Sequence, residues 1–246
     1  MSEKREIFVE LFETEQKNLK KTESLFGKEI QNYRMCLELL RDAVANINDN
    51  NKAIRLRDFC VFQFCFRTIS SSKNLLDLIV RGYYWDAMII ERGLLENSCL
   101  ILYLLENETN IDKWMHGKTK LRDIRKELNL FSNKGFIMGY AYLSDFVHNN
   151  LGAIRHLVTA KSATEMSAQI EPKLIENYFE GWFLFYPKHA QLCLEVILKN
   201  YSENIDYELG TRIIKFLKKL DKDGDEFFDI HREVMPHKYK KKNLSE

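Results

Sequence analysis

Residues 83–106 read YYWDAMIIERGLLENSCLILYLLE, and this stretch decides the fold class. Apart from a few charged and amide side chains it is apolar on every side, which is typical of a helix buried at the centre of a helical protein. Gly82 precedes it and is suited to end an earlier helix, which we expect over residues 53–80. The sequence therefore predicts two consecutive long helices in the core.

Glycine and proline are scarce along the whole chain. Its 246 residues include 10 Gly and 3 Pro, whereas average usage would give roughly 17 and 12. Sheet proteins need these residues in their many turns, so their scarcity indicates long helices with few connections. Further helices are expected over residues 134–148, 172–200 and 206–221, with a kink at Pro187. The predicted fold class is all-α, a multi-helix bundle.

The N-terminal part predicts two helices, over residues 3–26 and 28–47, with a break at Gly27. The second helix carries apolar residues spaced alternately three and four apart, which is a narrow seam of the coiled-coil kind. The stretch Asn46 to Asn51 is expected to be a loop. The members of the seam are Ile30, Tyr33, Leu37, Leu40, Val44 and Ile47.

These patterns divide the chain into an N-terminal helical hairpin over residues 1–50, a core helical bundle over 51–205, and C-terminal helices with a basic tail over 206–246. Two interpretations of the hairpin stay open. It is either an arm that binds a protein partner through the seam, or a pair of outer helices of the same bundle.

The chain is almost neutral, with 37 Lys and Arg against 36 Asp and Glu. This balance excludes a surface that attracts polyanions overall, but it allows a local basic patch. No apolar run reaches the ~18 residues of a membrane span, and no secretory signal is expected. The five cysteines lack C-x-x-C spacing and are expected as buried small side chains. We therefore expect a cytoplasmic protein with no membrane contact.

Two charged side chains interrupt the apolar helix on one face. Arg92 and Glu96 are four residues apart and therefore adjacent on a helix. Burying an ion pair costs several kcal/mol per ion, in order of magnitude, unless its geometry and further hydrogen bonds compensate. An apolar helix that keeps both residues uses them either as a structural cross-link or as a site.

A second polar group lies in residues 140–148, which read YAYLSDFVH. Ser144 and Asp145 precede His148 by four and three residues, so all three can meet on one helix surface. A carboxylate beside a histidine fixes its tautomer and raises its basicity, which suits a general acid or base. The other interpretation is a helix-end histidine satisfied by its neighbours. We expect one interhelical polar pocket to be formed by Arg92, Glu96, Ser144, Asp145 and His148.

The runs WDAMIIERGLLEN (85–97) and YLSDFVHN (142–149) resemble a bacterial helical family of uncharacterised function, which pairs an Arg-x-x-x-Glu helix with a later Ser-x-x-x-His helix. That family is similar to the HEPN-like bundles of toxin–antitoxin and phage-defence systems. The resemblance covers roughly residues 60–200 and implies a homodimer. The signature positions it implies are Arg92, Glu96, Ser144 and His148. Ribonuclease members carry Arg-x(4–6)-His, a spacing that the predicted core helices lack.

The leading functional prediction is a HEPN-like protein of a defence or stress system, whose pocket binds a nucleotide or an RNA-type phosphate ligand. Arg92, Asp145 and His148 are the candidate catalytic residues. Arg92, Glu96 and Ser144 are the candidate ligand-binding residues, because a guanidinium fork suits phosphate. No cofactor and no metal site are expected.

Two alternatives remain at this point. One is a non-enzymatic interaction or accessory subunit, in which the polar cluster is only a buried network. The other is a metal-dependent enzyme that uses Glu96, Asp145 and His148. His189, in an aromatic helix, is expected to be a core histidine rather than a site residue.

Overall fold

The computed structural model of the chain describes residues 7–50, 55–130, 134–148 and 184–230. Regular secondary structure within these ranges is entirely helical, which confirms the predicted all-α multi-helix bundle. The elements are α1 (Ile7–Asn50), α2 (Leu56–Arg81), α3 (Tyr84–Glu106), α4 (Asn110–Met115), α5 (Leu121–Glu127), α6 (Lys134–Val147), α10 (Lys188–Tyr201), η2 (Ser202–Asn204) and α11 (Tyr207–Ile230).

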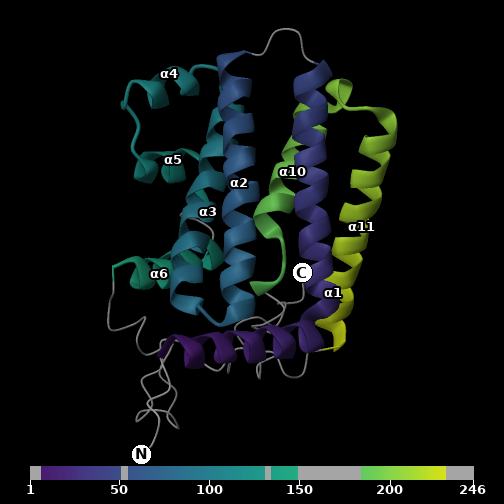
Figure 1. The fold of residues 1–246 in the computed structure, drawn as a ribbon. Helices are drawn as coiled ribbons and strands as arrows, with labels where there is room; N and C mark the ends of the chain where they lie inside the picture. Colours follow the sequence, from purple (N-terminus) through teal and green to yellow (C-terminus); the bar gives the residue numbers. More distant parts are fainter. Residues whose placement is uncertain (1–6, 51–54, 131–133, 149–183, 231–246) are drawn as a thin grey trace, which may run out of the picture.

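The long helices run side by side along the bundle, and the shorter ones lie to one side (Figure 1). The second half of α1 stands among α2, α10 and α11, and α3 packs along α2. On its outer side α3 contacts α5 and α6. The helix predicted to be central is therefore covered from several sides, and α6 lies directly against it.

The N-terminal part, predicted as two helices with a break, is one helix that bends at the break. Its backbone leaves helical geometry at Phe26 (φ −126°, ψ 26°), beside the predicted break at Gly27. The first half lies across one end of the bundle and the second half runs along it (Figure 1). Helix α1 also continues to Asn50, through most of the expected loop.

Contacts on both sides of the bend explain its geometry. Asn18, in the first half of α1, donates a hydrogen bond of 3.1 Å to the backbone carbonyl oxygen of Arg81 at the end of α2. Phe26, at the bend, is fully buried, and its ring centroid lies 5.1 Å from that of Phe185. The first half is thus fixed to the end of the α2–α3 pair, while the second half enters the core.

Every member of the N-terminal seam is buried, and its helix packs on α2, α10 and α11 of the same chain. The seam residues are therefore part of the bundle, which is the second of the two interpretations given for the N-terminal segment. One hydrophobic core extends from Phe26 to Leu220 and draws on all three predicted segments of the chain.

The helix expected over residues 172–200 is interrupted rather than kinked. Residues 185–187 are not helical, and α10 begins at Lys188 with Pro187 as its N-cap. A proline is tolerated at a helix start because no intrahelical donor is lost there. Three predictions lie wholly or partly outside the described residues. They concern the helix before residue 184, the stretch 149–170 and the basic tail from Lys238 to Lys242.

Four of the five cysteines are buried, as predicted, and the fifth is partly exposed. Cys36, Cys65, Cys99 and Cys193 are buried and Cys60 is half-buried. Burial raises the pKa of Cys99 to about 11, so its thiol stays protonated at neutral pH. None of the described helices combines the length and the hydropathy that crossing a membrane requires.

Candidate functional site

Arg92 of α3 stands at the centre of a polar cluster between α3 and α6. Its side chain is 12 % exposed, and its guanidinium forms an ion pair with Glu96 one turn along the same helix. Its Nε donates to the Ser144 hydroxyl oxygen at 3.3 Å, and its Nη2 donates to the Tyr140 hydroxyl. The structure thus brings together three predicted site residues and adds Tyr140. We call Arg92, Glu96, Tyr140, Ser144 and Arg125 the Arg92 cluster.

The two α6 members of the cluster are fixed by further bonds. The Ser144 hydroxyl donates to the backbone carbonyl oxygen of Tyr140 at 2.7 Å, and the Tyr140 hydroxyl lies 3.3 Å from Glu96 Oε1, to which it donates. Tyr140 and Ser144 are four residues apart, so one turn of α6 presents both of them to α3.

Arg125, on the short helix α5, was not predicted as a site residue. Its guanidinium carbon lies 3.9 Å from the centroid of the Tyr140 ring, and that of Arg92 lies 3.5 Å from the same centroid. Both are close enough for cation–π attraction. Burial, and after it the nearby charge of Arg92, lowers the pKa of Arg125. Two like charges are therefore held around one aromatic ring.

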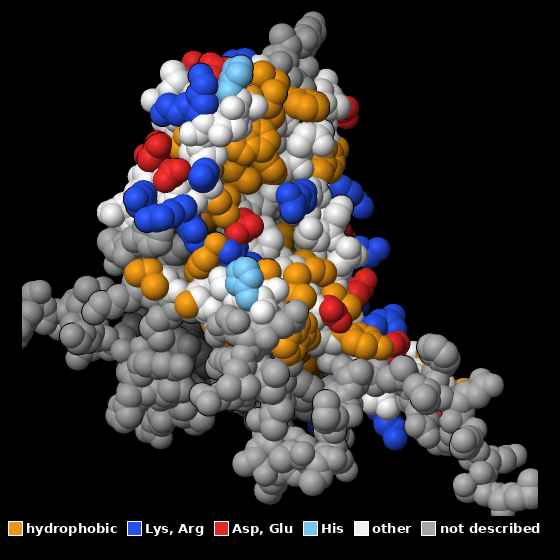
Figure 2. Space-filling model, turned by 90° about the vertical axis from the view of Figure 1, so that its left-hand side faces the viewer, with side chains coloured by type: hydrophobic (Ala, Val, Ile, Leu, Met, Phe, Trp, Pro, Cys, Tyr) orange, Lys and Arg blue, Asp and Glu red, His pale blue; other side chains and the backbone are white. Residues whose placement is uncertain are grey.

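The segment that leads into α5 and forms it is strongly basic. Lys118, Lys120, Arg122, Arg125 and Lys126 fall within nine residues that contain one acidic residue, Asp123. All of these cations except Arg125 have exposed side chains. Lysine and arginine side chains gather on the left of the face shown in Figure 2. We call residues 118–126 the α5 basic segment; it is a local positive patch on an almost neutral chain.

His148 and Asp145 are the two remaining predicted site residues. His148 follows α6 directly and is exposed, and its backbone N–H donates to the Ser144 carbonyl oxygen at 3.0 Å. It is therefore one helical turn from Ser144. The side chain of Asp145 lies outside the described part of the structure. Among the described side chains, no group of three or more His, Cys, Asp and Glu is arranged to hold a metal ion.

A second cluster, centred on Glu91, is buried between α3 and α10. Glu91 Oε1 lies 2.6 Å from Lys188 Nζ and 3.1 Å from His189 Nε2, and His189 Nδ1 lies 2.9 Å from the Ser98 hydroxyl. Burial alone would raise the pKa of Glu91, but Lys188 and His189 hold it well below its ordinary range. His189 is buried, as predicted for a core histidine.

The Glu91 cluster contains the residue types of a catalytic triad: a serine, a histidine and a carboxylate, here Ser98, His189 and Glu91. Their positions suit a different role. All three side chains are at least nine-tenths buried. Each lies on a long helix, and the chain of contacts joins α3 to α10. A buried charge that is paired and hydrogen-bonded is the usual form of an internal cross-link, so we interpret the Glu91 cluster as structural.

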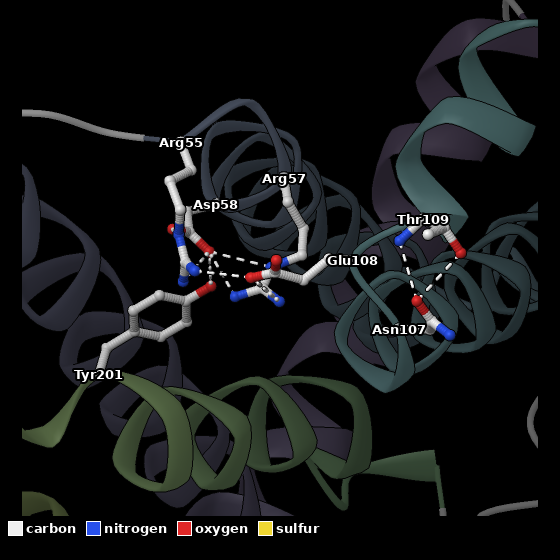
Figure 3. Close-up of polar contacts among 7 residues, drawn as sticks. All are labelled: Arg55, Arg57, Asp58, Asn107, Glu108, Thr109 and Tyr201. Carbon is white, nitrogen blue, oxygen red and sulfur yellow. Dashed lines mark hydrogen bonds and ion pairs between the residues drawn. The ribbon is translucent and has the colours of Figure 1, made fainter.

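A third cluster surrounds the buried carboxylate of Asp58 near the start of α2 (Figure 3). Arg55 Nε lies 2.8 Å from Asp58 Oδ2, and the Tyr201 hydroxyl donates to Asp58 Oδ1 at 2.8 Å. Arg57 and Glu108 extend the network towards the end of α3. Burial would raise the pKa of Asp58, but hydrogen bonds from Arg55 and Tyr201 hold it below its ordinary value. This cluster ties three helices together at one end of the bundle.

The sequence contains signals for some members of these clusters and not for others. Arg92, Glu96 and Ser144 were found because charged or hydroxyl residues recur at helical spacing in apolar helices. Arg125 lies in a short, mixed segment without such periodicity, so only the packing of α5 on α3 reveals it. Glu91 lies in the same apolar helix and was not predicted to form a cluster, because its partners Lys188 and His189 are almost a hundred residues away.

Comparison with known proteins assigns no relatives to this chain. No family model matches it, and neither a curated protein nor a solved structure does so. The geometry of the Arg92 cluster is therefore the basis for assigning a function.

Proposed function

We propose that the Arg92 cluster binds a phosphate-bearing ligand of nucleotide or RNA type. The observation that carries this proposal is the pair of guanidinium groups, from Arg92 and Arg125, held over one tyrosine ring. Placing two like charges side by side is unfavourable; burial, and after it the charge of Arg92, lowers the pKa of Arg125. An anion bound beside both groups would relieve this repulsion.

The surroundings of the cluster support an anionic ligand further. The exposed cations of the α5 basic segment raise the local concentration of anions near the site. The planar fork of an arginine matches the geometry of phosphate oxygens. The Ser144 hydroxyl is a neutral group of the kind that commonly bonds phosphate oxygens as well.

His148 and Asp145 complete the proposed site. His148 is exposed and lies one turn from Ser144, so it is the group that we assign to proton transfer as an acid or base. Asp145 is proposed to orient it, on the basis of their spacing in the sequence. A place in a bacterial defence or stress system and a homodimer are proposed from the motif resemblance. A cytoplasmic setting is proposed from the cysteine pattern.

The other two clusters support ligand binding less well than the Arg92 cluster does. In the Asp58 cluster Arg55 and Arg57 are shared between two carboxylates, those of Asp58 and Glu108. In the Glu91 cluster the carboxylate is buried and is already paired with Lys188 and His189. The Arg92 cluster differs, because among the described side chains it places two guanidinium groups beside the carboxylate of Glu96.

Titration of the purified protein with AMP and with a short RNA tests the proposal. The wild type is compared with Arg92→Ala, and Arg67→Ala serves as a matched control, because Arg67 is an exposed arginine on α2. We expect Arg92→Ala to weaken binding about tenfold or more, as loss of a charge-assisted contact does, and Arg67→Ala to leave it unchanged. Equal binding by all three proteins would overturn the proposal.

A further inference from the structure

The guanidinium of Arg92 is already bonded on each of its nitrogen atoms. Nη1 contacts Glu96, Nη2 contacts Tyr140 and Nε contacts Ser144. These contacts engage three of its five N–H groups. A phosphate group that takes the place of Glu96 on Nη1 must displace that carboxylate, and the three partners differ in how firmly they are held.

Tyr140 and Ser144 are held by contacts besides those with Arg92. The Tyr140 ring lies beneath the guanidinium of Arg125 as well, and the Ser144 hydroxyl is bonded to the backbone of its own helix. Glu96 is the anionic partner, and its side chain is 34 % exposed, against 12 % for Arg92. Its carboxylate can rotate into water, where hydration compensates for the lost ion pair.

We infer that Glu96 is an internal competitor for the ligand: its carboxylate occupies the fork of Arg92 until the phosphate group of the ligand displaces it. This inference rests on the proposed function and adds a determinant of affinity to it. While Glu96 is in place, its carboxylate compensates the charge of Arg92 and acts on that of Arg125 as well. Once it has turned away, the positive charge of Arg92 faces the incoming anion.

Glu96→Gln is the variant that tests this role. Glutamine keeps the size of the side chain and an oxygen that accepts hydrogen bonds from Arg92 and Tyr140, but it carries no charge. We expect the variant to bind inorganic phosphate and AMP about threefold to tenfold more tightly than the wild type does, which corresponds to loss of a partly exposed ion pair.

Two further variants control the measurement. Glu127→Gln makes the same change of charge at an exposed position on α5 and should leave the affinity within about twofold of the wild type, because charges outside the site are screened. Glu96→Asp keeps the charge on a shorter stem, so the carboxylate withdraws from Arg92. Its affinity should lie between those of the wild type and Glu96→Gln. Calorimetric titration of all four proteins, each first shown to unfold cooperatively, gives the comparison.

The outcomes separate this inference from the proposed function. If the wild type binds phosphate and Arg92→Ala does not, but Glu96→Gln binds no more tightly than the wild type, the function stands and the competitor role is overturned. A gain in Glu127→Gln as large as that in Glu96→Gln also overturns it. If neither the wild type nor Glu96→Gln binds phosphate or AMP, both proposals fail.

Discussion

Arg92 and Ser144 are 52 residues apart in the sequence, and Arg92 Nε lies 3.3 Å from the Ser144 hydroxyl oxygen. This contact joins the polar turn of α3 to the polar turn of α6. Because Ser144 also bonds the carbonyl oxygen of Tyr140, the contact fixes both the position of the guanidinium and the rotation of α6 about its axis.

Replacing Ser144 by alanine removes an acceptor from Arg92 without opening a large cavity. We expect Ser144→Ala to lower the free energy of unfolding by about 1 kcal/mol, the usual net value of such a hydrogen bond, and to weaken phosphate binding. Urea denaturation measures the first effect and calorimetric titration the second. Ser70→Ala, at an exposed position on α2, is the control; identical behaviour of the two variants would contradict the assignment.

The Glu91 cluster predicts an acid-labile core. The folded protein holds the pKa of Glu91 well below its ordinary value, so the unfolded chain binds a proton there at a higher pH than the folded chain does. The stability contributed by this carboxylate is therefore complete above about pH 5 and is lost progressively as the pH falls below ~4.

Glu91→Gln tests this dependence. We expect the free energy of unfolding at pH 7 to fall by about 3 kcal/mol, because the variant removes the carboxylate that Lys188 and His189 contact. The free energy of unfolding of the variant should also change less between pH 5 and pH 3, because the carboxyl group that takes up a proton on unfolding is gone. Glu38→Gln, at an exposed position on α1, should change neither quantity appreciably. Parallel pH profiles of wild type and Glu91→Gln would refute the role given to Glu91.

A pair of tyrosines tests the Asp58 cluster. Tyr201 is buried and its hydroxyl donates to Asp58, whereas Tyr207 is 90 % exposed. Tyr201→Phe removes a donor from a buried carboxylate and should lower the free energy of unfolding by roughly 1–3 kcal/mol. Tyr207→Phe should lower it by less than about 0.5 kcal/mol. Equal effects in urea denaturation would show that the hydrogen bond contributes nothing.

Removal of residues 1–50 distinguishes a bundle helix from a detachable arm. The seam residues of α1 are buried in the common core, and each large apolar side chain lost from a core costs about 2–5 kcal/mol. We therefore expect the shortened chain to lack a cooperative thermal transition in circular dichroism. A shortened chain that unfolds cooperatively would show that the arm interpretation was the right one.

Local patterns predict much of this fold correctly. The apolar run before Glu106 predicts a helix over 83–106, and α3 spans Tyr84–Glu106. Gly82 ends α2 in the left-handed conformation (φ 92°), where glycine carries no steric penalty. These features depend on neighbours in the sequence, which is why the sequence is sufficient to locate them.

The errors concern how the helices are arranged around breaks. Gly27 indicates a break, but the direction of the chain after it is set by the burial of Phe26 against Phe185, far away in the sequence. Similarly, Pro187 indicates a disruption, while the length of the interruption depends on tertiary packing. For the site, helical spacing identified Arg92, Glu96 and Ser144, and the partner from another element, Arg125, required the three-dimensional structure.

The most direct test of the Arg92 site is a calorimetric titration of wild type and Arg92→Lys with AMP. Lysine keeps the positive charge and removes the planar fork, so the variant separates specific recognition from general attraction by the α5 basic segment. We predict that Arg92→Lys binds AMP about tenfold or more weakly than the wild type does, while it still unfolds in one cooperative thermal transition. Equal affinities in the two folded proteins would contradict the account.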